Sequence, residues 1–144
     1  IKAEAQLELG VSGDPRVSLE TGIRNSISKV VNFDPSTGTP TDTAIDAYVN
    51  VVLTEYDAAG PSGKLDILMK EYFIASFGNG LETYNGYRRT GFPSNFQPSL
   101  DPNPGDYYRS ALYPANYVNN NSNATQKERT EQIFWDTNPA GFIN

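Results

Sequence analysis

The sequence predicts an all-α fold: a tetratricopeptide-like helical hairpin plus long helices, followed by an irregular, loop-rich C-terminal subdomain. Three observations carry this prediction. Apolar residues recur at spacings of three and four through most of residues 1–89, which is the period of an amphipathic helix. Residues that favour helix starts and ends, such as Asp-Pro and Gly, separate these periodic segments. After Gly91, prolines recur among Asn, Asp, Ser and Tyr, and the periodicity stops.

A pair of helices with a short connection opens the chain. Residues 1–9 carry Ala, Leu and Glu in helical phase, and Gly10 follows where a C-terminal cap belongs. The Asp14-Pro15 pair supplies an N-cap and a first-turn proline for a second helix that ends near Asn32. A single hairpin of this kind cannot bury its own apolar face. We therefore expect residues 1–33 to be the C-terminal part of a tetratricopeptide-like helical region within a longer chain.

A third helix is expected after a loop at residues 34–40, which we take as a subdomain joint. Thr43 and Asp46 match a weak capping box at its start. One apolar stripe then follows the helix: Ile45, Tyr48, Val49, Val52, Leu53 and Tyr56. We assign residues 41–144 to the C-terminal subdomain.

A fourth helix should be the longest. Gly60-Pro61 ends the third helix, and Ser62 is expected to cap the next one, which keeps one apolar face as far as about Arg89. Gly78 and Gly80 lie inside it, so we expect them to permit close packing, a bend or contact with another backbone. The periodic aromatic residues of both helices are expected in the core: Tyr48, Tyr56, Tyr72 and Phe73.

The region after Gly91 is expected to be ordered but irregular. Its prolines divide it: Pro93, Pro98, Pro102, Pro104 and Pro114. Its many aromatic side chains indicate that it packs onto other parts of the protein. Thr125 and Glu128 have a capping spacing that predicts a short turn of helix before Ile133.

The composition narrows the classes of function. A chain of 144 residues with 38% apolar residues has the size and the core of one ordinary domain. Its net charge of −6 argues against a nucleic-acid partner, because phosphate binding needs clustered Lys and Arg. No run approaches the roughly 20 apolar residues that a membrane-spanning helix needs.

Catalysis and metal binding have few candidate residues. The chain has no His and no Cys, which excludes catalytic triads built on them and the usual zinc and haem sites. Glu55, Glu71 and Glu82 lie on predicted helices, and no spacing marks a carboxylate pair for glycoside hydrolysis. Asp, Asn and backbone oxygens of DPNPGD at residues 101–106 could in principle bind Ca²⁺, but their spacing does not match an EF-hand loop. We expect no cofactor, no metal site and no enzyme activity.

The most specific pattern is FGNGLETYNGYRRTGFP at residues 77–93. It resembles a phrase of the form FGNGLEAYNEYRRTGYP in the long C-terminal helix of SusD/RagB-type proteins. Further downstream, Arg109, Tyr113-Pro114 and Asn119-Asn120 are similar to that family's R, YP and N elements. Residues 133–136 are similar to its aromatic-Trp-Asp ending.

The resemblance implies a SusD-like outer-membrane lipoprotein at the cell surface that binds oligosaccharide or polysaccharide for nutrient uptake. It implies a TonB-dependent outer-membrane transporter as partner, on which the protein sits as a lid. Membrane association would come only through a lipid anchor upstream of Ile1, with its signal peptide. Two alternatives stay open: a structural helical interaction module, or a surface lipoprotein for a non-carbohydrate nutrient such as a peptide.

Aromatic and polar residues together predict where sugar would bind. Aromatic rings cover the apolar faces of sugar rings, while Asn, Asp and Arg reach the hydroxyl groups. The candidates for ligand contact are Tyr107, Tyr108, Arg109 and Trp135. We expect Tyr107 and Tyr108 to form an exposed platform.

The family phrase itself is expected to be structural. Cations in the last turn of a helix complement its dipole, and guanidinium groups can donate to the carbonyls of an irregular loop. The residues of this structural motif are Arg88, Arg89, Gly91 and Pro93.

Overall fold

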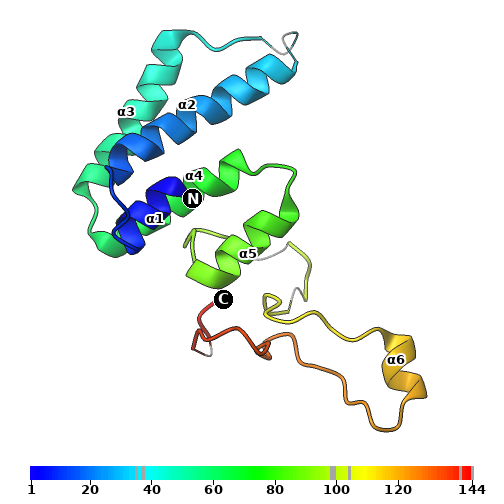
Figure 1. Ribbon diagram of the computed structural model, residues 1–144. Helices are drawn as coiled ribbons and strands as arrows, with labels where there is room; N and C mark the ends of the chain where they lie inside the picture. Colours follow the sequence, from blue (N-terminus) through cyan, green and yellow to red (C-terminus); the bar gives the residue numbers. More distant parts are fainter. Residues whose placement is uncertain (35, 37, 98–99, 104, 140, 144) are drawn as a thin grey trace.

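The computed structural model describes residues 1–34, 36, 38–97, 100–103, 105–139 and 141–143. This part of the chain folds into six helices and contains no β-strand, which confirms the all-α prediction (Figure 1). The helices are α1 (Lys2–Glu8), α2 (Pro15–Phe33), α3 (Asp42–Ala58), α4 (Pro61–Ala75), α5 (Gly80–Thr90) and α6 (Ala115–Asn120). None of the helices so described is both long and apolar enough to cross a membrane.

Helices α1 to α4 pack around one core. Helix α1 contacts α2 and α4, while α2 and α3 contact each other and both contact α4. Buried side chains from all four helices meet there: Ala3, Leu19, Ile23, Val49, Val52, Leu53, Tyr56, Leu68 and Met69. The predicted division between residues 1–33 and 41–144 therefore runs through helices that share a core, and it stays a prediction.

The helix starts show which capping signals were correct. Asp14 caps α2 by accepting the Arg16 amide at 2.8 Å, as its sequence context predicts. The predicted cap of α3 was wrong by two residues, because Thr41 caps it by accepting the Ala44 amide at 3.2 Å. The predicted cap of α4 was also wrong. Gly60 occupies that position with Pro61 first in the helix, a place where proline loses no hydrogen bond.

The predicted longest helix is two helices, so that prediction was wrong. Helix α4 ends at Ala75 and α5 begins at Gly80, and the chain changes direction between them (Figure 1). Gly78 has φ +86°, a left-handed conformation that a helix cannot contain. Asn79 then caps α5 by accepting the Glu82 amide at 3.4 Å. Of the roles expected for these glycines, the bend is the one observed, since a Cβ on either would meet nothing within 4 Å.

Two of the four aromatic residues expected in the core lie at its edge. Tyr56 is buried, and Tyr72 packs against the core. Tyr48 is 41% exposed and Phe73 is 37% exposed, so their assignment to the core was wrong. Tyr48 lies at the edge because its hydroxyl reaches Glu71, and the Phe73 ring instead packs edge-on against Phe96 at 4.7 Å.

The region after Gly91 is mainly irregular, as predicted. It leaves the body, carries α6 at its far end and returns to the C-terminal end of α5 (Figure 1). The short turn of helix predicted between Thr125 and Ile133 is not a helix: the Glu131 amide donates to the Glu128 carbonyl at 3.2 Å in a single turn, and α6 lies earlier, with Pro114 at its N-cap position. Pro98 and Pro104, expected to divide this region, lie outside the described residues.

The two glycines at the bend make a matched pair for mutation. Gly78→Ala should lower the free energy of unfolding by about 1–2 kcal/mol, because alanine is strained at positive φ. Gly80→Ala should leave it unchanged or raise it by up to about 1 kcal/mol, since Gly80 has a helical backbone. Urea denaturation of both variants measures the difference. Equal losses in the two would contradict a bend set by the Gly78 backbone.

Candidate functional site

The C-terminal end of α5 is fixed by a glycine that no other residue can replace without strain. Gly91 has φ +72°, and its amide donates to the Tyr87 carbonyl at 2.7 Å. A Cβ there would lie 3.3 Å from the Phe142 ring. Pro93 follows, buried, after a cis peptide bond. The helix end therefore lies where the sequence motif predicts it.

Arg88 lies in the last turn of α5 and is 9% exposed. Its guanidinium stacks between two aromatic rings, 4.8 Å from the centroid of Tyr84 and 4.3 Å from that of Trp135. Nη1 donates to the Arg109 carbonyl at 2.9 Å, and Nη2 to Asn85 Oδ1 at 3.0 Å. Nε has no hydrogen-bond partner among the described residues. Arg88 thus joins α5 to two distant parts of the loop region.

Arg109 and Asp136 form a buried ion pair beneath this layer. Arg109 is 3% exposed, and its Nε and Nη2 donate to Asp136 Oδ2 at 3.0 and 2.8 Å. Its remaining donors reach the carbonyls of Pro139 at 2.7 Å and Asn138 at 2.8 Å. A buried charge is stable only when it is paired and hydrogen-bonded in this way. The guanidinium therefore holds two stretches of irregular chain together.

Asn138 connects that ion pair to α5. Its amide nitrogen Nδ2 donates to the carbonyl of Arg88 at 3.1 Å and to that of Arg89 at 3.3 Å, which have no partner inside the helix. Its backbone amide donates to Asp136 Oδ1 at 3.1 Å. Sequence reasoning assigned no role to Asp136 or Asn138. An Asp two residues before an Asn is a common turn signal, but it does not identify the distant partners.

The pKa of Asp136 is lowered by this network. Burial alone raises it, but the hydrogen bonds from Arg109 and from the Asn138 amide outweigh burial and favour the carboxylate. The folded state therefore keeps Asp136 ionised at acidities where an unfolded chain would protonate it.

Arg89 points the other way, toward the first helix. Its Nη1 forms an ion pair with Glu4 Oε1, so α5 is tied to α1. The Arg89 side chain is 58% exposed, whereas that of Glu4 is 12% exposed. The two adjacent arginines thus have different surroundings, one inside the loop region and one at the surface.

A cleft of about 720 Å³ lies where α1, α5 and residues 135–138 meet. Its lining includes acidic, basic and amide side chains as well as one indole: Glu4, Glu8, Glu82, Asn85, Arg88, Arg89, Trp135, Asp136 and Asn138. Trp135 is 52% exposed, so the ring that stacks on Arg88 still presents surface to the cleft. The neighbouring Phe134 is almost fully exposed and does not line the cleft.

The four predicted ligand residues are not brought to one surface. Trp135 lines the cleft, and Arg109 is buried behind it. The Tyr107 ring packs against Tyr87 at 5.3 Å and its hydroxyl donates to the Gln97 carbonyl, so the predicted exposed platform is incomplete. Tyr108 is exposed, with the Arg129 guanidinium 4.7 Å from its ring centroid.

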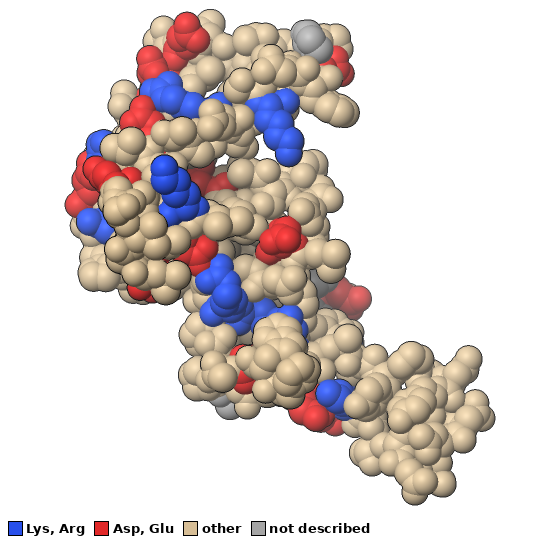
Figure 2. All heavy atoms as spheres, in the orientation of Figure 1, with Lys and Arg blue, Asp and Glu red and all other residues tan. Residues whose placement is uncertain are grey.

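A separate lobe carries α6 and is almost free of charge. Residues 110–126 contain no Lys, Arg, Asp or Glu, and the corresponding part of Figure 2, at the lower right, is nearly all uncharged. Tyr113 and Gln126 join its two sides through hydrogen bonds of 3.0 and 2.9 Å. The Tyr113 and Tyr117 rings lie 5.4 Å apart.

Within the described residues no group of three or more acidic side chains is placed to hold a metal ion. Two of the glutamates considered for hydrolysis have tyrosine partners instead. Both oxygens of Glu71 accept from the Tyr48 hydroxyl at 2.9 Å, and Glu82 accepts from that of Tyr72 at 3.1 Å. Of these two glutamates only Glu82 lines the cleft, where it offers an acceptor in addition to the Trp135 ring surface.

A family model described as SusD-like, "Susd and RagB outer membrane lipoprotein", matches residues 5–134. Comparison with curated proteins and with solved structures finds no significant match. The match covers most of α1, all of α2 to α6 and the chain as far as Phe134.

Removing Arg109 should be the most damaging change in the loop region. Arg109→Leu leaves Asp136 buried without a counter-ion, which should lower the free energy of unfolding by about 3–5 kcal/mol. Arg16→Leu is the control, because Arg16 and Asp57 form an exposed ion pair and its loss should change stability little. Chemical denaturation compares the two. Similar losses in both would contradict a special role for the buried pair.

The stability of the protein should fall in acid partly through Asp136. A carboxylate whose pKa is lowered by folding contributes stability above its ordinary pKa of about 3.9, and that stability is lost as the pH falls through the folded value. Asp136→Asn should therefore lose less stability than the parent between about pH 5 and pH 2. Denaturation at a series of pH values measures the slopes, and equal slopes would contradict the assignment.

Proposed function

The chain belongs to the SusD-like family of outer-membrane lipoproteins, and from that premise we propose that it captures glycan at the cell surface and delivers it to a TonB-dependent outer-membrane transporter. Proteins of this family are generally binding proteins without catalytic activity. The role proposed for this chain is likewise binding alone. The lipid anchor belongs to the same proposal, upstream of Ile1.

Trp135 in the cleft is the observation that carries the proposal. An indole presents a large flat apolar surface, which suits the C–H face of a sugar ring. One side of this ring is already stacked on Arg88 at 4.3 Å, a contact that favours one orientation of the ring before any ligand binds. A ring held in this way loses little conformational freedom on binding, which favours affinity.

Side chains that can form hydrogen bonds line the same cleft as the Trp135 indole. Asn85 and Arg89 are exposed on α5, and both line the cleft. Arg88 also lines the cleft, but it is buried and acts there by stacking on the Trp135 ring. Carboxylates of Glu8 and Glu82 provide acceptors. Donors and acceptors around one aromatic surface are the combination that glycan recognition requires.

The other three predicted ligand residues do not line the cleft, and the proposal gives them different roles. Arg109 would act by holding Asp136 and Asn138, which form one wall of the cleft. Tyr107 and Tyr108 remain predicted contacts outside the cleft lining. The structural roles proposed for Arg88, Arg89, Gly91 and Pro93 are supported by the contacts of the two arginines and by the left-handed backbone of Gly91.

Replacing Trp135 should abolish retention on polysaccharide. Trp135→Ala removes the stacking surface, and a loss of about 1–3 kcal/mol would weaken binding by roughly 5- to 150-fold. Affinity gel electrophoresis of the full-length protein against a panel of polysaccharides measures this directly. The matched control is Phe134→Ala, since Phe134 is the adjacent exposed aromatic residue and lies off the cleft.

The outcomes separate the competing functions. Retention of the parent and of Phe134→Ala, but not of Trp135→Ala, supports glycan binding in the cleft. Retention of all three places the sugar elsewhere. If no polysaccharide retains the parent or either variant, the glycan proposal is contradicted, and a peptide-like nutrient or a helical interaction module is favoured.

A further inference from the structure

The cleft between α1, α5 and residues 135–138 has more acidic than basic side chains. Its charged lining residues are four acids and two arginines: Glu4, Glu8, Glu82, Asp136, Arg88 and Arg89. Asp136 is balanced by the buried Arg109, whose Nη2 lies 2.8 Å from Asp136 Oδ2. The charge that a ligand meets in the cleft therefore depends on how the other five side chains are paired.

Both arginines of the cleft lining already have partners within the protein. Arg89 forms an ion pair with Glu4, whose side chain is only 12% exposed. A ligand anion that took Arg89 away would leave Glu4 nearly buried without a counter-ion, which is costly. Arg88 is itself buried, and its two Nη atoms donate to the Arg109 carbonyl at 2.9 Å and to Asn85 Oδ1 at 3.0 Å. An anionic ligand would therefore have to break an existing contact to reach either guanidinium.

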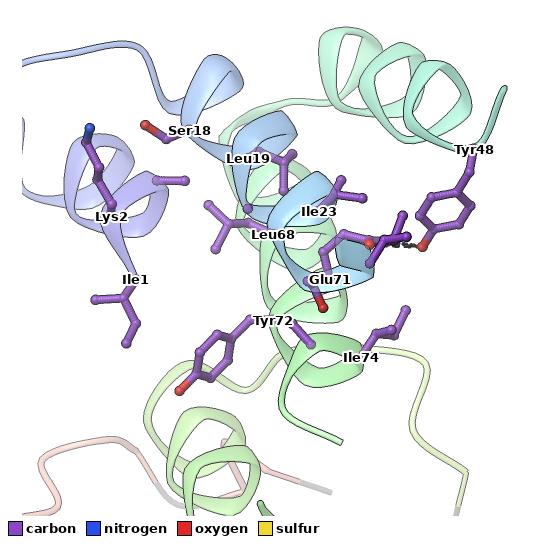
Figure 3. Close-up of a pocket in the computed structure, with 15 residues that line it drawn as sticks. Ile1, Lys2, Ser18, Leu19, Ile23, Tyr48, Leu68, Glu71, Tyr72 and Ile74 are labelled. Carbon is purple, nitrogen blue, oxygen red and sulfur yellow. Dashed lines mark hydrogen bonds between the residues drawn. The ribbon is translucent and has the colours of Figure 1, made fainter. Parts of the chain in front are cut away.

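Glu8 and Glu82 are the acidic lining residues that are open to a ligand. Both are exposed, and neither forms an ion pair among the described residues. Tyr72 extends from α4 toward α5 (Figure 3), and its hydroxyl donates to Glu82 Oε2 at 3.1 Å, so Oε1 is left for a further donor. A carboxylate accepts from a hydroxyl group in a charge-assisted hydrogen bond, which is stronger than a bond between neutral groups.

We propose that the cleft selects uncharged glycans over glycans that carry uronate or sulfate groups, and that Glu8 and Glu82 determine this selectivity. Their carboxylates accept from the hydroxyl groups of a neutral sugar and repel an anionic group on the sugar. Both line one cleft of about 720 Å³, so a ligand that fills it lies beside both. Exposed charges interact over about 8 Å at physiological salt, which is far enough to act on such a ligand. The inference rests on the glycan binding proposed for this cleft and adds the class of glycan.

Matched pairs of polysaccharides test the selectivity. Each neutral polysaccharide of a panel is compared with its own partly carboxymethylated derivative, and calorimetric titration measures binding of both to the full-length protein. The carboxymethylated form should bind at least about fivefold more weakly than the neutral form. Raising the salt from about 0.05 M to about 0.5 M should strengthen binding of the carboxymethylated form, because salt screens the repulsion, and should leave binding of the neutral form unchanged.

Charge-removing variants locate the source of the repulsion. Glu8→Gln and Glu82→Gln each take one negative charge out of the cleft, so each should reduce the difference between the two forms by about two- to fivefold. Glutamine at position 82 keeps an oxygen that can accept from Tyr72, so the change alters charge more than shape. Glu55→Gln is the matched control, because it removes the same charge from an exposed position of α3 outside the cleft lining. It should leave the difference unchanged.

The outcomes distinguish failure of the selectivity from failure of the proposed function. If the carboxymethylated form binds as tightly as the neutral form or more tightly, or if its binding weakens as salt is added, the selectivity is overturned while glycan capture stands. If Glu55→Gln reduces the difference as much as the cleft variants do, the effect belongs to the overall charge of the chain, and the selectivity is again overturned. If the protein binds neither form of any polysaccharide, the proposed function is contradicted and the selectivity with it.

Discussion

The buried guanidinium of Arg109 is the constraint on which the C-terminal half depends. Its charge is stable away from water only while Asp136 and two backbone carbonyls surround it. Few apolar side chains are buried after α5. Apart from Pro93, Ile143 is the buried apolar residue among the residues described there. A polar network therefore takes the place of a hydrophobic core in this region. Through Arg88 and Asn138 it also binds the last turn of α5, whose end Gly91 sets, and it contacts the Trp135 ring.

Much of the helical half was predictable because its signals are local. Three signals depend only on residues a few positions apart: the helical spacing of apolar residues, the Asp14 cap and the glycine that ends α5. The break at Gly78 was missed because the apolar face continues in phase on both sides of it, so periodicity alone does not reveal a left-handed residue. Tyr48 was misplaced for a related reason: its spacing predicts burial, but its hydroxyl reaches Glu71 at the edge of the core.

The site was much less predictable, because its contacts join residues far apart in the sequence. Arg109 was expected to face a ligand on account of its loop context, and its partner Asp136 lies 27 residues away. Asn138 reaches Arg88 across 50 residues. No local pattern encodes such pairings. The family phrase located the end of α5 correctly, because Gly91 and the two arginines act on that helix and its nearest surroundings.

The distance between Asn138 and α5 also affects how the protein is made. At the usual speed of translation, about 5–20 residues per second, several seconds separate the synthesis of Arg88 from that of Asn138, which lies 50 residues later. During that interval the helical half can assemble, since its contacts are mostly between successive helices. The last carbonyls of α5 stay open until residues 136–138 emerge from the ribosome. Completion of the fold is thus coupled to completion of this segment, and a nascent chain that stalls earlier exposes an unfinished helix end to chaperones and proteases.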